Sequence, residues 1–373
     1  GDVYKSQGVD DLEGARVAYL VSPGFDYPAV QWGIWRAGGV AVPLCLSHPR
    51  PELEYVIDDC QARLLVASPE SIPRLQPIAQ SRQLELRCTT ELAACLPTPL
   101  PDVAEGRPAM IIYTSGTTGS PKGVVTSHAN IRAQIESLVE AWEWSHEDRV
   151  LLVLPLHHVH GIINVLSCAL WSGAVCEMQP RFEETEVWRR FQTSPLTLFM
   201  AVPTIYSRLA ASWEGVDREA QEARSAACRR FRLMVSGSAA LPVGLFERWQ
   251  EITGHALLER YGMTEIGMAL SNPLHGDRLP GHVGVPLPGI EVRRADAEGR
   301  PVNPDEPAEI EVRGDGVFVE YWGRPSETES AFREGWFRTG DVAVVDRGSY
   351  RILGRQSVDI IKTGGYKVSA LEV

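Results

Sequence analysis

The chain has 373 residues and a formal net charge of −12 at pH 7. Its 44% of hydrophobic and 23% of charged residues are typical of a soluble globular protein and argue against intrinsic disorder. The acidic balance argues against a nucleic-acid-binding protein, because binding to phosphate backbones needs a surplus of Lys and Arg. At this length we expect two or three lobes built around sizeable cores.

The seven cysteines form no CxxC pair, so the sequence favours neither a zinc site nor a disulfide framework and fits a reducing compartment. The longest apolar stretch, residues 150–178, is interrupted by three histidines and by Asn164, which would be costly inside a bilayer. We therefore expect buried core there and no transmembrane segment. The chain starts at Gly1 without a signal-like apolar region, so we expect any targeting segment to lie outside it.

Short apolar runs alternate with helical segments over most of the chain. The spacing predicts helices at 29–37 and 241–253, and strands at 17–21, 64–67, 110–113, 150–154, 196–202 and 233–235. This alternation predicts an α/β fold with mostly parallel sheets covered by helices. A polar run at 214–230 has alternating charges and is expected to be a solvated helix.

The character of the sequence changes after about Gly281. From there, Gly and Pro separate short β-rich runs at 290–293, 309–312, 342–345 and 350–352. We expect these runs to form a smaller β lobe. We therefore divide the chain into an α/β core over residues 1–280, a β-rich subdomain over 281–354 and a final segment over 355–373.

A candidate phosphate-binding loop follows the apolar run at 110–113. Residues 113–123 read YTSGTTGSPKG, with glycines that let the backbone approach an anion, hydroxyls that donate hydrogen bonds and Lys122 as a point charge. This is not a Walker loop, because Lys122 is followed by Gly123 rather than by Ser or Thr. A flexible loop without a ligand is the alternative. The candidate nucleotide-binding residues here are Thr114, Ser115, Gly116, Thr117, Thr118, Gly119 and Lys122.

This run resembles, nearly residue for residue, the phosphate-loop signature of the adenylate-forming superfamily of acyl-CoA synthetases and other AMP-binding enzymes. Further motifs of that superfamily follow in its order and extend the resemblance over essentially the whole chain. They read PLHHVHG at 155–161, SGSAALP at 236–242, YGMTE at 261–265, YW at 321–322, GWFRTGD at 335–341 and GR at 354–355. The resemblance implies the large N-terminal domain of these enzymes, with the core at 1–280 incomplete at its N-terminus.

The resemblance also implies roles for single residues. Tyr261 would stack on adenine, Asp341 and Arg355 would hold the ribose hydroxyls, Thr264 would contact the α-phosphate and Glu265 would hold Mg²⁺. An aromatic face suits a purine, a carboxylate accepts hydrogen bonds from vicinal hydroxyls, and a hard cation prefers oxygen ligands. The predicted catalytic residues are Lys122, Thr264 and Glu265, and the remaining predicted nucleotide-binding residues are Gly237, Ser238, Glu259, Arg260, Gly262 and Met263.

Enzymes of this superfamily use ATP and Mg²⁺ to activate a carboxylate as its acyl-adenylate, and a small C-terminal domain then rotates so that coenzyme A can take the acyl group. No protein nucleophile is needed, so the protein mainly positions the reactants and stabilises charge. The chain stops at Val373, just past the hinge that the resemblance places within 355–373. We therefore expect the C-terminal lobe to be absent from this chain, and the chain alone to be defective in forming the thioester.

The residue before the YGMTE tyrosine indicates the class of acid. Arg260 stands where most relatives carry a small residue, and a guanidinium can bind a second, distal carboxylate bidentately. A structural ion pair with Glu259 or another acid is the alternative. Arg208, His160 and Ser238 add polar groups that a fatty-acyl tunnel would exclude. The predicted substrate-binding residues are His158, His160, Arg208, Ser238, Arg260 and Met263.

This set of residues resembles malonyl-CoA synthetases, especially the mitochondrial form of animals. The resemblance implies malonate as the substrate and methylmalonate as a second one. It also implies the mitochondrial matrix as the location, with the cytoplasm as the alternative.

Two other functions stay open. A medium-chain monocarboxylate acyl-CoA synthetase is the enzymatic rival, and its pocket would end in an apolar tunnel. A non-catalytic relative that binds ATP or an adenylate is the second, although the presence of Lys122, Glu265 and Asp341 speaks against it. An amino-acid adenylation domain is disfavoured, because residues 157–160 read HHVH where such domains carry an Asp.

Overall fold

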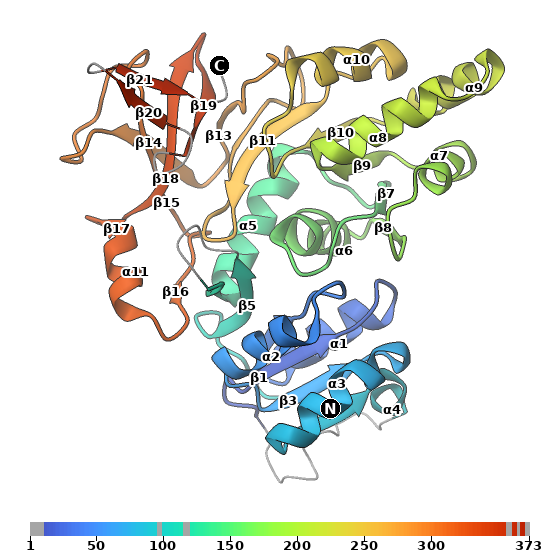
Figure 1. Cartoon of the computed structure of the whole chain (residues 1–373), viewed down its shortest axis with the longest axis vertical. Coiled ribbons are helices and arrows are strands. Elements are labelled where there is room, and N and C mark those ends of the chain that lie inside the picture. Colours follow the sequence, from blue (N-terminus) through green and yellow to red (C-terminus); the bar gives the residue numbers. More distant parts are fainter. Residues whose placement is uncertain (1–10, 95–98, 115–119, 356–359, 364–365, 370–373) are drawn as a thin grey trace.

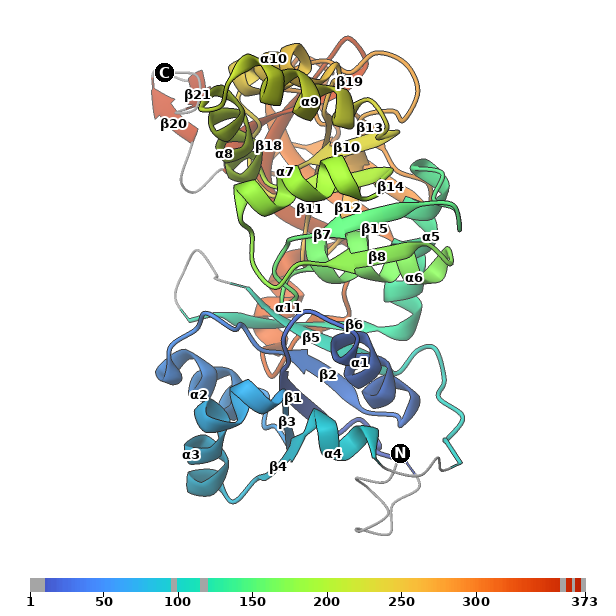
Figure 2. The ribbon, with the colours of Figure 1, turned by 90° about the vertical axis from the view of Figure 1, so that its right-hand side faces the viewer.

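The computed structural model describes residues 11–94, 99–114, 120–355, 360–363 and 366–369. Within these ranges the chain forms two seven-stranded sheets with flanking helices and a smaller antiparallel β lobe, arranged as Figures 1 and 2 show. The predicted α/β class is therefore confirmed. Among the described residues, no helix is both long and apolar enough to cross a membrane.

The first sheet has the strand order β16-β6-β5-β2-β1-β3-β4. Strands β1 to β5 run parallel, whereas β6 and β16 are antiparallel to their neighbours. The side chains of residues 17–20 are fully buried, as expected for a parallel sheet covered on both faces. The elements are β1 (Arg16–Leu20), α1 (Asp26–Arg36), β2 (Val40–Pro43), α2 (Arg50–Asp59), β3 (Leu64–Ala67), η2 (Pro69–Ser71), α3 (Ile72–Arg82), β4 (Glu85–Cys88), α4 (Thr89–Ala93), β5 (Pro108–Thr114), β6 (Lys122–Ser127) and β16 (Glu320–Tyr321).

The second sheet has the order β13-β12-β11-β10-β9-β7-β8, and its strands β7 to β11 run parallel. Helix α5 contacts β6 of the first sheet and β12 of the second, so it joins the two layers. The elements are α5 (His128–Ala141), β7 (Arg149–Leu152), η3 (His160–Ser167), α6 (Cys168–Trp171), β8 (Val175–Met178), α7 (Glu184–Thr193), β9 (Leu198–Ala201), α8 (Pro203–Glu214), α9 (Arg218–Cys228), β10 (Leu233–Ser236), α10 (Val243–Thr253), β11 (Leu258–Met263), β12 (Gly267–Ser271) and β13 (Val285–Pro286).

The β lobe follows, and its strands pair antiparallel. Two segments after residue 280 pair with the large sheets instead, β13 with β12 and β16 with β6. The predicted domain boundaries after residues 280 and 354 stay predictions. The elements are β14 (Ile290–Ala295), β15 (Ala308–Gly314), α11 (Pro325–Ala331), β17 (Phe332–Arg333), β18 (Trp336–Asp346), β19 (Ser349–Arg355), β20 (Ile360–Thr363) and β21 (Tyr366–Ser369).

The apolar stretch at 150–178 is largely buried core, as predicted, but it contains a π-helix that its sequence pattern did not reveal. All residues of this helix, η3, are buried. Single π-helical turns occur often at functional sites. The polar run at 214–230 contains α9, whose buried residues are confined to its end at Ala227 and Cys228.

Buried hydrogen bonds tie β1 of the first sheet to α1, and α1 to the segment before η3. The Tyr19 hydroxyl donates to Gln31 Oε1 at 3.0 Å, and the hydroxyls of Tyr19 and Tyr27 lie 3.1 Å apart. The Tyr27 hydroxyl donates to the carbonyl oxygen of Leu156. The side chains of Tyr19, Tyr27 and Gln31 are buried, and the bond from Tyr27 to Leu156 fixes the segment that leads into η3.

Candidate active site

One large cavity, of about 1280 Å³, lies where the two sheets and the β lobe meet. Thr114 and Lys122 of the first sheet line one side. The segment 153–161, the end of β11 with residues 262–265, and residues 337–340 of the β lobe line the others. The cavity therefore collects the predicted motifs from the whole length of the chain.

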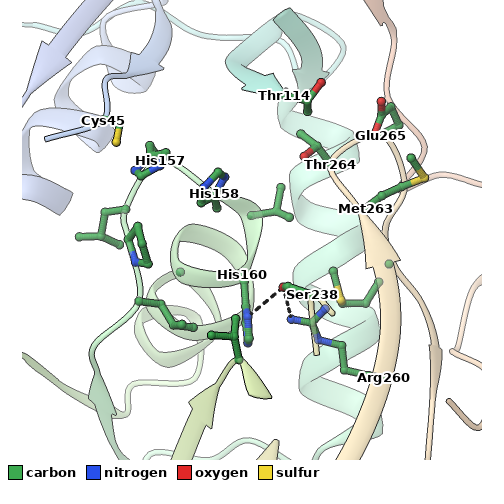
Figure 3. Close-up of a pocket in the computed structure, with 18 of the residues that line it drawn as sticks. Cys45, Thr114, His157, His158, His160, Ser238, Arg260, Met263, Thr264 and Glu265 are labelled. Atoms are coloured by element: carbon green, nitrogen blue, oxygen red, sulfur yellow. Dashed lines mark hydrogen bonds between the residues drawn. The ribbon is translucent and has the colours of Figure 1, made fainter. Parts of the chain in front are cut away.

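Three of the predicted substrate-binding residues, Arg260, Ser238 and His160, meet at one corner of this cavity (Figure 3). Arg260 Nη2 donates to Ser238 Oγ at 3.2 Å, and Ser238 Oγ lies 3.2 Å from His160 Nδ1. Arg260 lies on β11, Ser238 follows β10 and His160 follows β7. These strands run parallel within one sheet, so groups near their carboxyl ends gather at one edge.

Arg260 is a buried cation, with only 2% of its surface exposed. Burial lowers the pKa of its guanidinium to about 9. Burial also lowers the pKa of His160 well below its ordinary value, and the nearby Arg260 adds to this effect, so His160 is neutral at pH 7. Among the described residues no carboxylate pairs with Arg260, and its Nε has no hydrogen-bond partner. A buried charge without a partner is costly, so this corner suits an anionic ligand.

The residue before Arg260 does not line the cavity. Glu259 Oε1 instead accepts a hydrogen bond from the Leu241 backbone N–H at 3.2 Å, and burial raises the pKa of the Glu259 carboxyl to about 7. The structural alternative, an ion pair between Arg260 and Glu259, is therefore wrong. The predicted nucleotide-binding role of Glu259 has no support from its position.

The backbone around this corner is tightly packed. Ser238 adopts a φ of 68°, a left-handed conformation that is uncommon outside glycine and that clusters at functional sites. A Cβ at Gly262 would lie 2.1 Å from the carbonyl oxygen of Gly267, and a Cβ at Gly237 would strike the side chain of Arg260. Glycine is therefore needed at both positions for close approach.

His158, Met263 and Arg208 also line the cavity, as the sequence predicted for substrate-binding residues. Arg208 lies at the rim. Its side chain is 57% exposed and forms an ion pair with Glu184. The charge of Arg208 is thus already balanced, unlike that of Arg260.

The predicted adenosine-binding residues are joined to one another. The Tyr261 hydroxyl donates to Asp341 Oδ2 at 2.6 Å, and Arg355 Nε donates to Asp341 Oδ1 at 3.2 Å. The pairing of β18 with β19 sets Asp341 opposite Arg355. Arg355 lines the cavity, whereas Tyr261 and Asp341 lie next to lining residues. An aromatic ring, a carboxylate and a guanidinium are groups that suit adenine and ribose, and the individual roles stay predictions.

Thr114, Lys122, Thr264 and Glu265 line the same cavity, at the end that is called here the phosphate end because the sequence predicts phosphate binding by these residues. Glu265 is 6% exposed, and burial raises the pKa of its carboxyl. The described residues contain no group of three or more His, Cys, Asp or Glu that could hold a metal. The Glu265 carboxylate, which lines the cavity, fits Mg²⁺, because proteins hold this ion through one or two carboxylates together with substrate phosphates. The predicted loop residues Ser115, Gly116, Thr117, Thr118 and Gly119 lie outside the described residues.

Two residues at the phosphate end received no role from the sequence. The Tyr321 hydroxyl donates to Glu265 Oε1 at 2.9 Å, and Glu327 forms an ion pair with Lys122. Tyr321 belongs to the YW motif at 321–322. That motif supported the family resemblance but carried no predicted chemical role. Glu327 lies on α11 and carries no signal in the sequence pattern.

The chain matches a known protein family over most of its length. Residues 6–322 match the family described as AMP-binding enzymes. A mitochondrial malonate–CoA ligase of Mus musculus is 49% identical, with 100% of this chain and 70% of that protein covered. A malonate–CoA ligase of Arabidopsis thaliana is 43% identical, with 99% of this chain and 64% of that protein covered.

Solved structures show the same likeness. The ATP-bound MatB protein from Rhodopseudomonas palustris has a TM-score of 0.88 at 34% identity, over 99% of this chain and 73% of that one. A malonyl-CoA ligase in a ternary product complex with methylmalonyl-CoA and AMP has a TM-score of 0.82 at 38% identity, over 95% of this chain and 75% of that one.

Proposed function

Because this chain belongs to the family of AMP-binding enzymes, we propose that it activates malonate as malonyl-adenylate at the expense of ATP, for transfer to coenzyme A. The relatives named malonate–CoA ligases, at 43% and 49% identity, support this substrate. Methylmalonate is the proposed second substrate, supported by the structural relative that was solved with methylmalonyl-CoA and AMP bound.

The buried guanidinium of Arg260 is the observation that carries the choice of a dicarboxylic acid. It faces the cavity without a carboxylate partner among the described residues, and Ser238 is its hydrogen-bonding neighbour. The distal carboxylate of malonate would complete this pair through charge-assisted hydrogen bonds. The alkyl chain of a medium-chain acid would leave the charge uncompensated. The rival monocarboxylate function is therefore disfavoured.

We assign different roles in the reaction to the two ends of the cavity. The Arg260 corner would hold one carboxylate, so that the other is presented towards Thr264 at the phosphate end. That carboxylate is already ionised at neutral pH, so its attack on the α-phosphorus needs no general base, and His160 can remain neutral. Lys122 would stabilise the charge of the departing pyrophosphate. Glu265 would hold Mg²⁺, which neutralises phosphate charge when it is bound.

The cellular location and the transfer of the acyl group to coenzyme A are also proposals. A relative is named mitochondrial, and we extend this to the mitochondrial matrix for the present protein. We assign thioester formation to the chain extended to the length of its relatives, called here the extended enzyme. The 373-residue chain alone is expected to bind ATP and to make little acyl-CoA. Thioester production by the chain at the rate of the extended enzyme would contradict this assignment.

A hydroxamate-trapping screen of mono- and dicarboxylic acids on the extended enzyme tests the proposal. Malonate and methylmalonate should give more hydroxamate than butyrate or hexanoate. A preference for hexanoate would favour the medium-chain alternative. Binding of ATP without release of pyrophosphate for any acid would favour the non-catalytic alternative.

A further inference from the structure

The short segment at 318–331 is joined to both charged groups of the phosphate end. Its backbone bonds on one side to Glu265, where the Phe318 N–H donates to the Glu265 carbonyl oxygen at 2.7 Å. On the other side, the Trp322 N–H donates to the Gly123 carbonyl oxygen at 2.8 Å, directly after Lys122. The segment therefore fixes the distance between the strand that starts at Lys122 and the residue Glu265.

Tyr321 lies in the middle of this segment and touches both charged side chains. Its hydroxyl donates to Glu265 Oε1 at 2.9 Å, and Lys122 Nζ lies 5.1 Å from the centre of its ring. This second contact is within the range of cation–π attraction. The Tyr321 side chain is 8% exposed, and its backbone N–H is held by Thr328 Oγ1 at 3.0 Å. Both contacts are thus made from a fixed ring.

Glu327, on helix α11, contacts the same lysine. Its carboxylate forms an ion pair with Lys122, which holds the pKa of that carboxyl below its ordinary value. The side chain of Glu327 is 40% exposed, and that of Lys122 is 23% exposed. An ion pair this accessible is weak and exchangeable.

We propose that Tyr321 and Glu327 position the phosphate-handling charges of this site. Tyr321 is a positioning residue that orients the Glu265 carboxylate for Mg²⁺. Glu327 is an internal counter-ion that keeps Lys122 in place until phosphate oxygens replace it. Both statements rest on the proposed function, since they assume that the cavity binds ATP with Mg²⁺.

Two physical arguments support these roles. A carboxylate with one oxygen held by a donor loses rotational freedom, so its second oxygen has a defined direction, and removing such outer partners usually weakens metal binding about 10- to 100-fold. An exposed carboxylate paired with an ammonium group competes with an incoming phosphate for it, and it is displaced when the phosphate binds. The segment at 318–331 supplies both functions from one rigid stretch.

The test of Tyr321 is calorimetric titration of the chain with ATP, in Mg²⁺ and in EDTA, without any acid substrate. Tyr321→Phe keeps the ring over Lys122 and removes the hydroxyl. We expect the gain in ATP affinity produced by Mg²⁺ to fall roughly 10-fold, while the affinity in EDTA stays the same. Equal losses in both buffers, or an unchanged response to Mg²⁺, would overturn the role of Tyr321. Tyr350→Phe removes a hydroxyl in the β lobe and should behave as the wild type.

The test of Glu327 uses the same titration. Glu327→Gln removes the competing carboxylate, so ATP should bind about two- to five-fold more tightly in both buffers, and the gain should shrink at high salt. Weaker binding of ATP would overturn the counter-ion role. Glu329→Gln, at an exposed position of the same helix, is the matched control. Failure of the wild type to bind ATP would instead contradict the proposed function, and failure of the malonate screen alone would leave these binding results valid.

Discussion

The guanidinium of Arg260 packs directly on the backbone of Gly237. A Cβ built at Gly237 would lie 2.6 Å from both Cζ and Nε of Arg260 and 2.8 Å from its Nη1. Gly237 is not in the left-handed region of φ, so the reason for glycine here is space alone. The smallest side chain at position 237 would therefore move the cation.

Gly237→Ala is expected to act on substrate selectivity through this contact. In the extended enzyme, kcat/KM for malonate should fall by about ten-fold or more, because about 1.36 kcal/mol of lost transition-state binding already has that effect. The value for butyrate should change little. Gly244→Ala in α10, where an added Cβ meets nothing within 4 Å, is the control. Equal losses for malonate and butyrate would show that the variant damages the site as a whole.

Arg260→Leu should remove malonate activation more completely. Breaking a buried charge pair costs roughly 3–5 kcal/mol, which corresponds to a loss of about two orders of magnitude or more in kcat/KM. Butyrate should lose little or gain. The measurement is the ratio of the two kcat/KM values in the extended enzyme. A common decline for both acids would make Arg260 structural and would remove the basis for a dicarboxylate substrate.

Arg208→Leu should shift the same ratio in the same direction, but less. The Arg208 side chain is 57% exposed and already paired with Glu184. Its loss should therefore change the electrostatic potential in the cavity only modestly. An effect of Arg208→Leu larger than that of Arg260→Leu would place the distal carboxylate at the rim rather than in the buried corner.

Asp341→Ala should weaken nucleotide binding. The predicted pair of hydrogen bonds to ribose is charge-assisted and contributes about 1.5–3 kcal/mol each before water compensates. Tyr261→Phe removes the hydroxyl that now donates to Asp341 but keeps the ring, so it should change ATP affinity much less. Calorimetry with ATP compares the two variants. An unchanged affinity in Asp341→Ala would exclude Asp341 from the nucleotide site.

Glu259 should make the stability of the fold depend on pH. Its pKa is about 7 in the folded chain against an ordinary 4.5, so between these values the folded state keeps a proton that the unfolded state has lost. Stability should therefore fall as pH rises from about 4.5 to about 7, by on the order of 3 kcal/mol at most. Glu259→Gln keeps an oxygen for the Leu241 N–H and cannot titrate, so its stability should not show this decline.

Urea unfolding at about pH 5 and about pH 7.5 measures the free energy of unfolding of the wild type and of Glu259→Gln. These two pH values span most of the interval in which Glu259 affects stability. Glu251→Gln, which changes an exposed carboxyl on α10, should follow the wild type. Parallel behaviour of wild type and Glu259→Gln across this interval would mean that the Glu259 carboxyl titrates normally in the fold.

The sequence was a good guide to buried strands, because a short apolar run between turn residues has few other solutions. The run at 64–67 coincides with β3, and that at 233–235 falls within β10. The sequence was a poorer guide to irregular elements. The π-helix η3 differs from an α-helix in its backbone hydrogen bonds, and this difference leaves no periodic mark in a stretch that is buried on every side.

In the candidate site, too, the sequence predicts some features and not others. The sequence predicts that Ser238 and Arg260 serve the same substrate, and their motifs do lie at the ends of neighbouring parallel strands. It does not predict the contact of Tyr321 with Glu265, because side chains 56 residues apart are brought together only in the folded chain, through the pairing of β16 with β6 and the bond from the Phe318 N–H to the Glu265 carbonyl oxygen. The pairing of Arg208 with Glu184 is hidden for the same reason, since it depends on how α7 packs beside α8.

The buried hydrogen bond from Tyr27 to Leu156 has a consequence for the interpretation of natural sequence variants. Tyr27 does not line the cavity and lies far along the chain from the site motifs, so a substitution there would ordinarily be classed as a simple folding defect. Yet its hydroxyl holds the backbone that leads to His158 and His160. A natural Tyr27→Phe variant would lose this hydrogen bond, so it needs to be tested for its preference among acids as well as for its abundance.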